Sequence, residues 1–173
     1  MAFGQEGFFR LLEEWDGLGV VVRRDAPTDA WIFVALHDDT LGRPVGGCRM
    51  KRYPRPEEGL RDALRLARGM TWKWAAMGLG FGGGKAVVAL TRELSPGERR
   101  GLLLRFGDLL ESLEGSYGTG EDLGTTPEDI RLVASRTRYV VGLPLGDEGP
   151  SDPGPYTALG WRTATATGAC RGG

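Results

Sequence analysis

The most constraining feature of this chain is the run from Met70 to Leu90, in which two lysines are the only charged residues. Lys73 lies among apolar residues and Lys85 directly follows three glycines. We therefore expect both lysines to lie where water is scarce, with no acid adjacent to them in the sequence.

Lysine is rare in this chain, which has 22 Lys and Arg residues but only one further lysine, Lys51. Unlike Arg, a desolvated Lys near another cation can lose its proton at neutral pH, which favours a role as a general base. The alternative is that the excess of Arg reflects codon usage and the lysines are incidental.

Length and composition favour one soluble domain with a core of its own, since the chain has 173 residues and a net charge of −1. Dispersed Arg interleaved with acids argues against a nucleic-acid partner. One histidine, His37, and two distant cysteines, Cys48 and Cys170, argue against a metal site. No apolar run reaches membrane length, and the acidic N-terminus does not resemble a signal peptide. We therefore expect a cytoplasmic protein that binds neither metal nor membrane.

The apolar periodicity predicts the α/β class, with a mixed sheet flanked by helices. Pro56, followed by two acids, is typical of a helix start, and Ser95 with Glu98 forms a capping-box pattern. The expected helices cover 5–15, 56–76, a segment after Ser95 and a segment from Pro127, and the expected strands cover 20–22, 31–36, 46–53, 85–90 and 139–141.

The glycine-rich segment matches a dinucleotide-binding pattern in its letters but not in its context. Gly78, Gly80 and Gly83 fit G-x-G-x-x-G, yet that motif needs a strand before the glycines and a helix after them. Here the order is reversed. A P-loop is also excluded, because Leu79 and Ala86 occupy its first glycine and its Ser/Thr positions. We expect these glycines to give a small ligand close access to the backbone.

Four short motifs occur in a fixed order at 45–50, 69–73, 82–87 and 120–126, reading VGGCRM, GMTWK, GGGKAV and GEDLGTT. Together they resemble the substrate-binding and oligomerisation domain of the Glu/Leu/Phe/Val dehydrogenases, with the leucine and phenylalanine branch most similar. The resemblance extends from about Gly17 to Gly160. It implies that family's N-terminal fold, an L-amino acid or 2-oxo acid as ligand, a homo-oligomer, and NAD as the cofactor of the complete enzyme.

The resemblance also implies roles for individual residues. Lys85 matches the catalytic lysine that activates the water interconverting imine and 2-oxo acid, and Asp122 matches the aspartate that passes a proton to and from the substrate amino group. Lys73 matches the lysine that binds the α-carboxylate, with Gly46 and Gly47 as backbone contacts in the same pocket.

The charges of these residues fit that chemistry. We expect Lys73 and burial together to lower the pKa of Lys85, with Asp122 supplying the opposite charge. Without the resemblance, the favoured interpretation of Asp122 is an ordinary turn or cap acid before Gly124, because Asp is common in turns.

Substrate preference is expected to be apolar. The glutamate-specific branch has a lysine before the Gly-Gly pair, where this chain has Val45, so a substrate carboxylate side chain would lack its cation. Met70 belongs to the same predicted pocket. Gly120 stands where leucine enzymes commonly have Ala, which would widen the pocket towards larger side chains. Cys48, where the family usually has Thr, is interpreted as a small buried residue.

The last residues depart from the family pattern. Family members continue into an NAD-binding Rossmann domain, which we expect to be absent from this chain, leaving it with no NAD site of its own. We predict one domain over 1–160 and an irregular tail over 161–173, whose Arg/Thr/Ala/Gly composition is typical of translation in a shifted reading frame. On this hypothesis the chain is a truncated dehydrogenase that is inactive alone.

Two other functions fit the sequence. One is a non-catalytic, single-domain protein that binds amino acids or regulates a full-length homologue by associating with it. The other is an unrelated α/β binding domain, which would leave the combination of Lys73, Lys85 and Asp122 unexplained.

Overall fold

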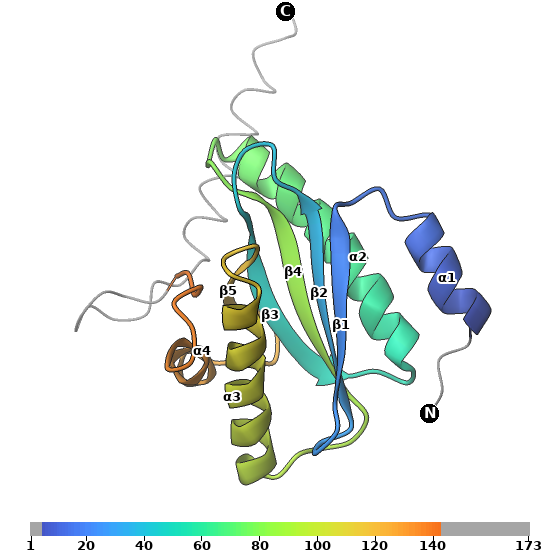
Figure 1. The fold of residues 1–173 in the computed structure, drawn as a ribbon, viewed down its shortest axis with the longest axis vertical. Helices are drawn as coiled ribbons and strands as arrows, with labels where there is room; N and C mark the ends of the chain where they lie inside the picture. The colour runs from blue at the N-terminus through green and yellow to red at the C-terminus, as the bar shows by residue number, and fades with distance from the viewer. Residues whose placement is uncertain (1–4, 143–173) are drawn as a thin grey trace, which may run out of the picture.

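A five-stranded mixed sheet with helices on both faces forms the protein, for which a computed structural model describes residues 5–142 (Figure 1). The strands lie in the order β1-β2-β4-β3-β5, so β4 is at the centre of the sheet. The elements are α1 (Gln5–Glu13), β1 (Gly19–Asp25), β2 (Ala30–Asp38), β3 (Pro44–Arg52), α2 (Pro56–Ala76), β4 (Gly82–Leu90), α3 (Pro96–Ser112), β5 (Gly118–Glu121) and α4 (Pro127–Ala134).

The strand directions explain why the sheet is mixed. Strands β1, β2 and β4 pair antiparallel, whereas β3 pairs parallel with both β4 and β5. A parallel neighbour requires a long crossover, and α2 provides it between β3 and β4. The fold class predicted from the periodicity is therefore confirmed.

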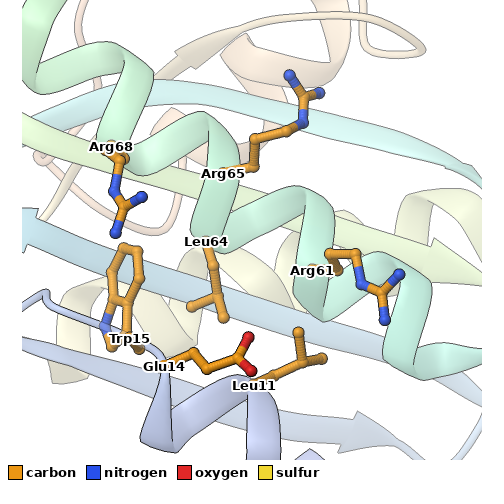
Figure 2. A pocket seen from close by; sticks show the side chains of 7 residues that line it. All are labelled: Leu11, Glu14, Trp15, Arg61, Leu64, Arg65 and Arg68. Carbon is orange, nitrogen blue, oxygen red and sulfur yellow. The ribbon is translucent and has the colours of Figure 1, made fainter. Parts of the chain in front are cut away.

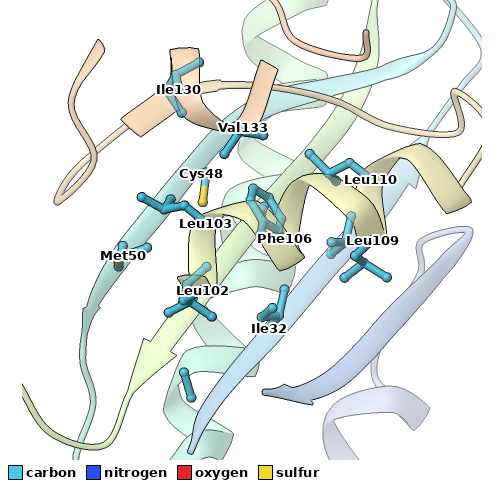
Figure 3. Close-up of a cluster of buried hydrophobic side chains, with 14 of the residues drawn as sticks. Ile32, Cys48, Met50, Leu102, Leu103, Phe106, Leu109, Leu110, Ile130 and Val133 are labelled. Carbon is cyan, nitrogen blue, oxygen red and sulfur yellow. The ribbon is translucent and has the colours of Figure 1, made fainter. Parts of the chain in front are cut away.

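Each face of the sheet carries its own hydrophobic cluster. On one face α2 packs on Phe33, Ala35, Val87 and Ala89, and α1 adds partly buried side chains to that cluster. On the other face α3 and α4 cover a second cluster, which includes Cys48 and Met50 of β3 (Figure 3). Because β4 is covered on both sides, residues 82–89 are all buried.

The predicted helix starts are confirmed. Helix α2 begins at Pro56 with two acids in its first turn and runs to Ala76 as expected. At α3 the hydroxyl of Ser95 accepts the N–H of Glu98, and the Glu98 carboxylate in turn accepts the N–H of Ser95, which completes the capping box. A second capping box, between Thr126 and Asp129, starts α4.

Two predictions about the strands are wrong in detail. A strand over 139–141 does not form; only an isolated bridge joins Val140 to Thr119. The actual edge strand is β5, a short Gly-rich segment with little apolar pattern to reveal it. Strand β4 also begins at Gly82, earlier than expected, so three glycines lie inside the strand, and in the glycine-rich segment only Gly78 has a positive φ.

The predicted domain boundary at 160 and the irregular tail over 161–173 lie outside the described residues. Within residues 5–142, no helix has the length and apolar character needed to cross a membrane.

The glycines of β4 allow α2 to lie directly on the sheet, which yields a stability prediction. A β-carbon at Gly83 would lie 2.6 Å from the backbone oxygen of Ala67 and would overlap Thr71. Gly83→Ala should therefore push α2 away and lower the free energy of unfolding by about 1–3 kcal/mol. Gly69, in the same helix, has open space around it, so Gly69→Ala should raise stability by about 0.5–1 kcal/mol. Urea denaturation of both variants tests this, and equal effects would contradict it.

Candidate functional site

Lys85 and Asp122, adjacent in the structure although 37 positions apart, form the centre of the site. Lys85 lies on the central strand β4, and Asp122 follows the end of β5. The Nζ atom of Lys85 is 3.1 Å from Oδ2 of Asp122. The structure thus brings together the two residues that the sequence predicted as catalytic, and their chemical roles stay predictions.

Lys85 is buried, with 4% of its surface exposed. Burial is the main cause that lowers its pKa below the usual value for lysine, Asp122 opposes this shift, and Arg49 lowers the pKa further. The sequence predicted Lys73 as the cation that lowers the Lys85 pKa together with burial, whereas Arg49 is the cation that contributes to the shift in the structure. Arg49 takes that place because β3 lies next to β4 in the sheet.

Asp122 is held in its ionised form. Burial by itself would raise its pKa, but Lys85 and Arg49 outweigh burial and hold the pKa below the usual value for aspartate. Its backbone N–H donates to the Thr125 hydroxyl at 3.0 Å. Gly124, with a φ of 81°, lets the following turn pass against the backbone of Met50.

The two predicted backbone contacts, Gly46 and Gly47, are positions at which neighbouring chain segments come close. A β-carbon at Gly47 would lie 2.7 Å from Cβ of Asp122, and one at Gly46 would overlap the carbonyl of Gly84. Glycine is thus required here by packing within the chain. Gly46 is buried and Gly47 is partly exposed.

Two further predicted pocket residues, Met70 and Lys73, lie in the last turns of α2. Cγ of Met70 lies 3.4 Å from the position that a β-carbon at Gly46 would take. The indole of Trp74 donates to the backbone oxygen of Val45 at 2.8 Å, and Val45 is buried. Residues three and four apart share a helix face, so Lys73 lies on the face of α2 that meets β3.

Lys73 is half-buried and has no carboxylate within 4.0 Å among residues 5–142. Its Nζ atom lies 5.5 Å from the centre of the Trp74 ring. A half-buried cation with no carboxylate partner in the described part of the chain suits an anionic ligand group.

Gly120 faces a segment that the sequence did not associate with the pocket. A β-carbon there would meet the backbone oxygen of Val141 at 3.1 Å. The space beside Gly120 is thus lined by the 140–141 segment, which pairs with Thr119.

Sequence reasoning missed an ion-pair network that extends from the site to α2. Arg49 contacts Asp122 through Nε at 2.9 Å and Asp62 through Nη1 at 3.0 Å. Asp62 also accepts hydrogen bonds from Tyr53 and Arg65. The available signal was alternation along β3, which places Gly47 and Arg49 on one face of the strand.

Two open hollows lie near the surface of α2. One, of about 200 Å³, lies between α1 and α2. None of the predicted site residues lines it. Its lining, drawn in Figure 2, consists of Leu11, Glu14, Trp15, Arg61, Leu64, Arg65 and Arg68. The other, of about 400 Å³, includes Tyr53, Asp62 and Arg65 and therefore adjoins the outer end of the ion-pair network.

The glycine-rich segment does not have the order of elements that a dinucleotide-binding motif needs. Helix α2 precedes the glycine turn and β4 follows it, so no helix N-terminus faces the glycines. No cluster of three or more His, Cys, Asp or Glu within residues 5–142 could hold a metal ion. Burial raises the pKa of the Cys48 thiol to about 12, which makes it a packing residue.

The fold and the lysine–aspartate pair together define a class: the N-terminal domain of amino-acid dehydrogenases. A family model described as "Glu/Leu/Phe/Val dehydrogenase, dimerisation domain" matches residues 24–139, and the chain belongs to this family.

Comparisons with individual proteins are consistent with this family. The chain is 40% identical over 152 residues to a leucine dehydrogenase of Bacillus subtilis, covering 88% of this chain and 41% of that protein. It is 41% identical over 143 residues to a phenylalanine dehydrogenase of Caldalkalibacillus thermarum, covering 82% and 38% of the two chains. The crystal structure of an L-tryptophan dehydrogenase from Nostoc punctiforme superimposes with a TM-score of 0.70 at 37% identity, covering 78% and 39%. The chain thus spans about two fifths of the length of these relatives.

The contact between Lys85 and Asp122 leads to a prediction about proton affinity. The Asp122 carboxylate stabilises the protonated amine, so Asp122→Asn should lower the pKa of Lys85 further. NMR titration of protein labelled with ¹³C at the lysine Cε measures this directly, because only three lysines give signals. An unchanged Lys85 titration in the variant would show that the pair does not form in solution.

Proposed function

We propose that this chain is the substrate-binding, catalytic-lysine domain of an NAD-dependent L-amino-acid dehydrogenase. The reaction is oxidative deamination of an apolar amino acid, such as leucine, valine or phenylalanine, to its 2-oxo acid. The observation that carries the proposal is the buried Lys85 amine, paired with Asp122 between glycine-rich segments of β3 and β4.

The lowered pKa of Lys85 supports a role as general base. In its neutral form the amine accepts a proton from water as the water oxygen adds to the carbon of the substrate imine. Asp122, which is ionised at the start, takes a proton from the substrate amino group and returns it when that group departs, and the reverse reaction uses the same two transfers in the opposite order. A base and a proton carrier 3.1 Å apart serve both directions of the reaction.

Lys73 is proposed to bind the α-carboxylate. Its support is the half-buried Nζ atom, which has no carboxylate partner among residues 5–142. Met70 and the backbone of Gly46 and Gly47 line the same pocket. The buried, uncharged Val45 supports an apolar substrate side chain, because no cation replaces it there for a second carboxylate.

The complete protein is proposed to be a cytoplasmic homo-oligomer that uses NAD. The family name of the matching segment, a dimerisation domain, supports assembly through this domain. Since the glycine-rich segment lacks the strand–turn–helix order of a dinucleotide-binding motif, we propose that the cofactor site lies outside residues 5–142. The domain boundary at 160 is also part of this proposal.

A chimaera tests the catalytic role. Residues 1–142 would replace the matching segment of the Bacillus subtilis leucine dehydrogenase, which supplies the rest of an enzyme. Lys85→Arg in the chimaera should lower kcat about 10²–10⁴-fold, because arginine cannot act as a base. Lys51→Arg, at an exposed lysine, should keep the activity of the parent chimaera. Activity of Lys85→Arg within tenfold of the parent would refute the base assignment.

Ligand binding by the chain itself tests the role of Lys73. Calorimetry should detect L-leucine with higher affinity than L-glutamate, and Lys73→Met should weaken leucine binding about tenfold or more, since a charged hydrogen bond contributes about 1.5–3 kcal/mol. Lys51→Met is the matched control. Binding without activity in the chimaera would favour the non-catalytic, amino-acid-binding alternative, and equal binding by the Lys73 variant would refute the carboxylate assignment.

A further inference from the structure

Arg49 lies between the Lys85–Asp122 pair and Asp62 of α2, and it contacts both aspartates. Its Nε atom donates to Oδ2 of Asp122 at 2.9 Å, the same oxygen that Lys85 contacts at 3.1 Å. The other oxygen of Asp122, Oδ1, receives no hydrogen bond from residues 5–142. One carboxylate oxygen is thus occupied by two cations and the other is left available.

Arg49 is itself fixed from the opposite side. Its Nη1 atom donates to Oδ2 of Asp62 at 3.0 Å, and the same oxygen accepts the Tyr53 hydroxyl at 2.7 Å. Arg65 donates to the remaining oxygen, Oδ1, at 2.7 Å. Burial by itself would raise the pKa of Asp62, but these three donors hold it below the usual value for aspartate, so this anchor stays charged.

The arrangement matters most when Lys85 is neutral. Once Lys85 gives up its proton, Asp122 loses that countercharge, and a lone buried carboxylate tends to take up a proton or turn towards water. Arg49 cannot lose its proton, so one countercharge remains on Oδ2 in both states. Arg49 contacts the two carboxylates from two different nitrogens of its planar guanidinium, a geometry that the single nitrogen of lysine does not offer.

A purely structural role of Arg49 would not need its contact with Asp122. The contact with Asp62 alone already joins β3 to α2, and the side chain of Arg49 is largely buried, with 18% exposed. The additional contact from Nε is directed at the one carboxylate that Lys85 also contacts.

We propose that Arg49 is a positioning residue, which holds Asp122 by Oδ2 and leaves Oδ1 available to the substrate amino group. Asp62 anchors Arg49 in turn. The proposal rests on the proposed function for the identity of the substrate, but its geometry can be tested without any catalysis.

The test is a pair of variants with opposite expected signs, measured by the lysine Cε titration of the full chain. Arg49→Met removes a cation close to Lys85, so the Lys85 pKa should rise by about one unit. Asp62→Asn removes the negative charge of Asp62, so Asp122 remains as the only carboxylate in contact with the Arg49 guanidinium. The Lys85 pKa should therefore fall, by less than it rises in Arg49→Met. General loosening of the site would instead raise it in both variants, because Lys85 would become exposed to water.

Controls separate this network from other ion pairs. Arg99→Met removes another partly buried arginine, paired with Asp129 and the backbone of Gly124, and should leave the Lys85 titration unchanged. Opposite shifts in the Arg49 and Asp62 variants support the proposal, and shifts of the same sign, or none, overturn it. If Arg49→Met does not fold, the sign of the Asp62→Asn shift decides.

In the chimaera, Arg49→Met should lower kcat more than it changes KM. The pH profile of kcat should move to higher pH, in the same direction as the Lys85 pKa. A chimaera without activity while the opposite NMR shifts are present would reject the proposed function and leave the positioning geometry intact. Unchanged kcat together with opposite shifts would overturn the catalytic importance of Arg49.

Discussion

The burial of one amine, that of Lys85, in the central strand is the constraint on which the rest of this structure depends. A lysine that is 4% exposed needs a carboxylate nearby, and Asp122 at the end of β5 provides it. Asp122 in turn needs a countercharge that does not titrate, and Arg49 provides that. Burial and Arg49 lower the pKa of Lys85, and Asp122 limits this shift, inside an ordinary α/β sheet.

The close packing of the elements around Lys85 depends on glycines. Helix α2 lies on Gly83, the ring of Tyr117 lies on Gly84, and Asp122 reaches β3 at Gly47, where a β-carbon would sit 2.7 Å from its own Cβ. Each glycine admits a neighbouring segment that a larger residue would displace. The glycines thus set the distances between the elements that carry Lys73, Lys85 and Asp122, whether or not a ligand is present.

The motifs, the helix starts and the α/β class were predictable because each depends on local sequence. Pro56, Ser95 and the apolar periods act within a few residues, and the segment of family resemblance agrees with the match over 24–139. Strand β5 was not predictable, since its Gly-Thr-Gly-Glu sequence has almost no apolar pattern. The segment 139–141 has that pattern but forms only a bridge, at the edge of the sheet beyond β5.

The sequence by itself determined which residues are chemically unusual, namely lysines retained in an Arg-rich chain and an aspartate in a glycine-rich motif. Only the tertiary structure decided which charges meet. Lys73 is the nearer cation to Lys85 along that apolar run, yet Arg49 is the one that lowers its pKa, because β3 and β4 are neighbours in the sheet. Electrostatic interactions depend on distance in space, and strand order, which sets that distance, depends on packing across the whole domain.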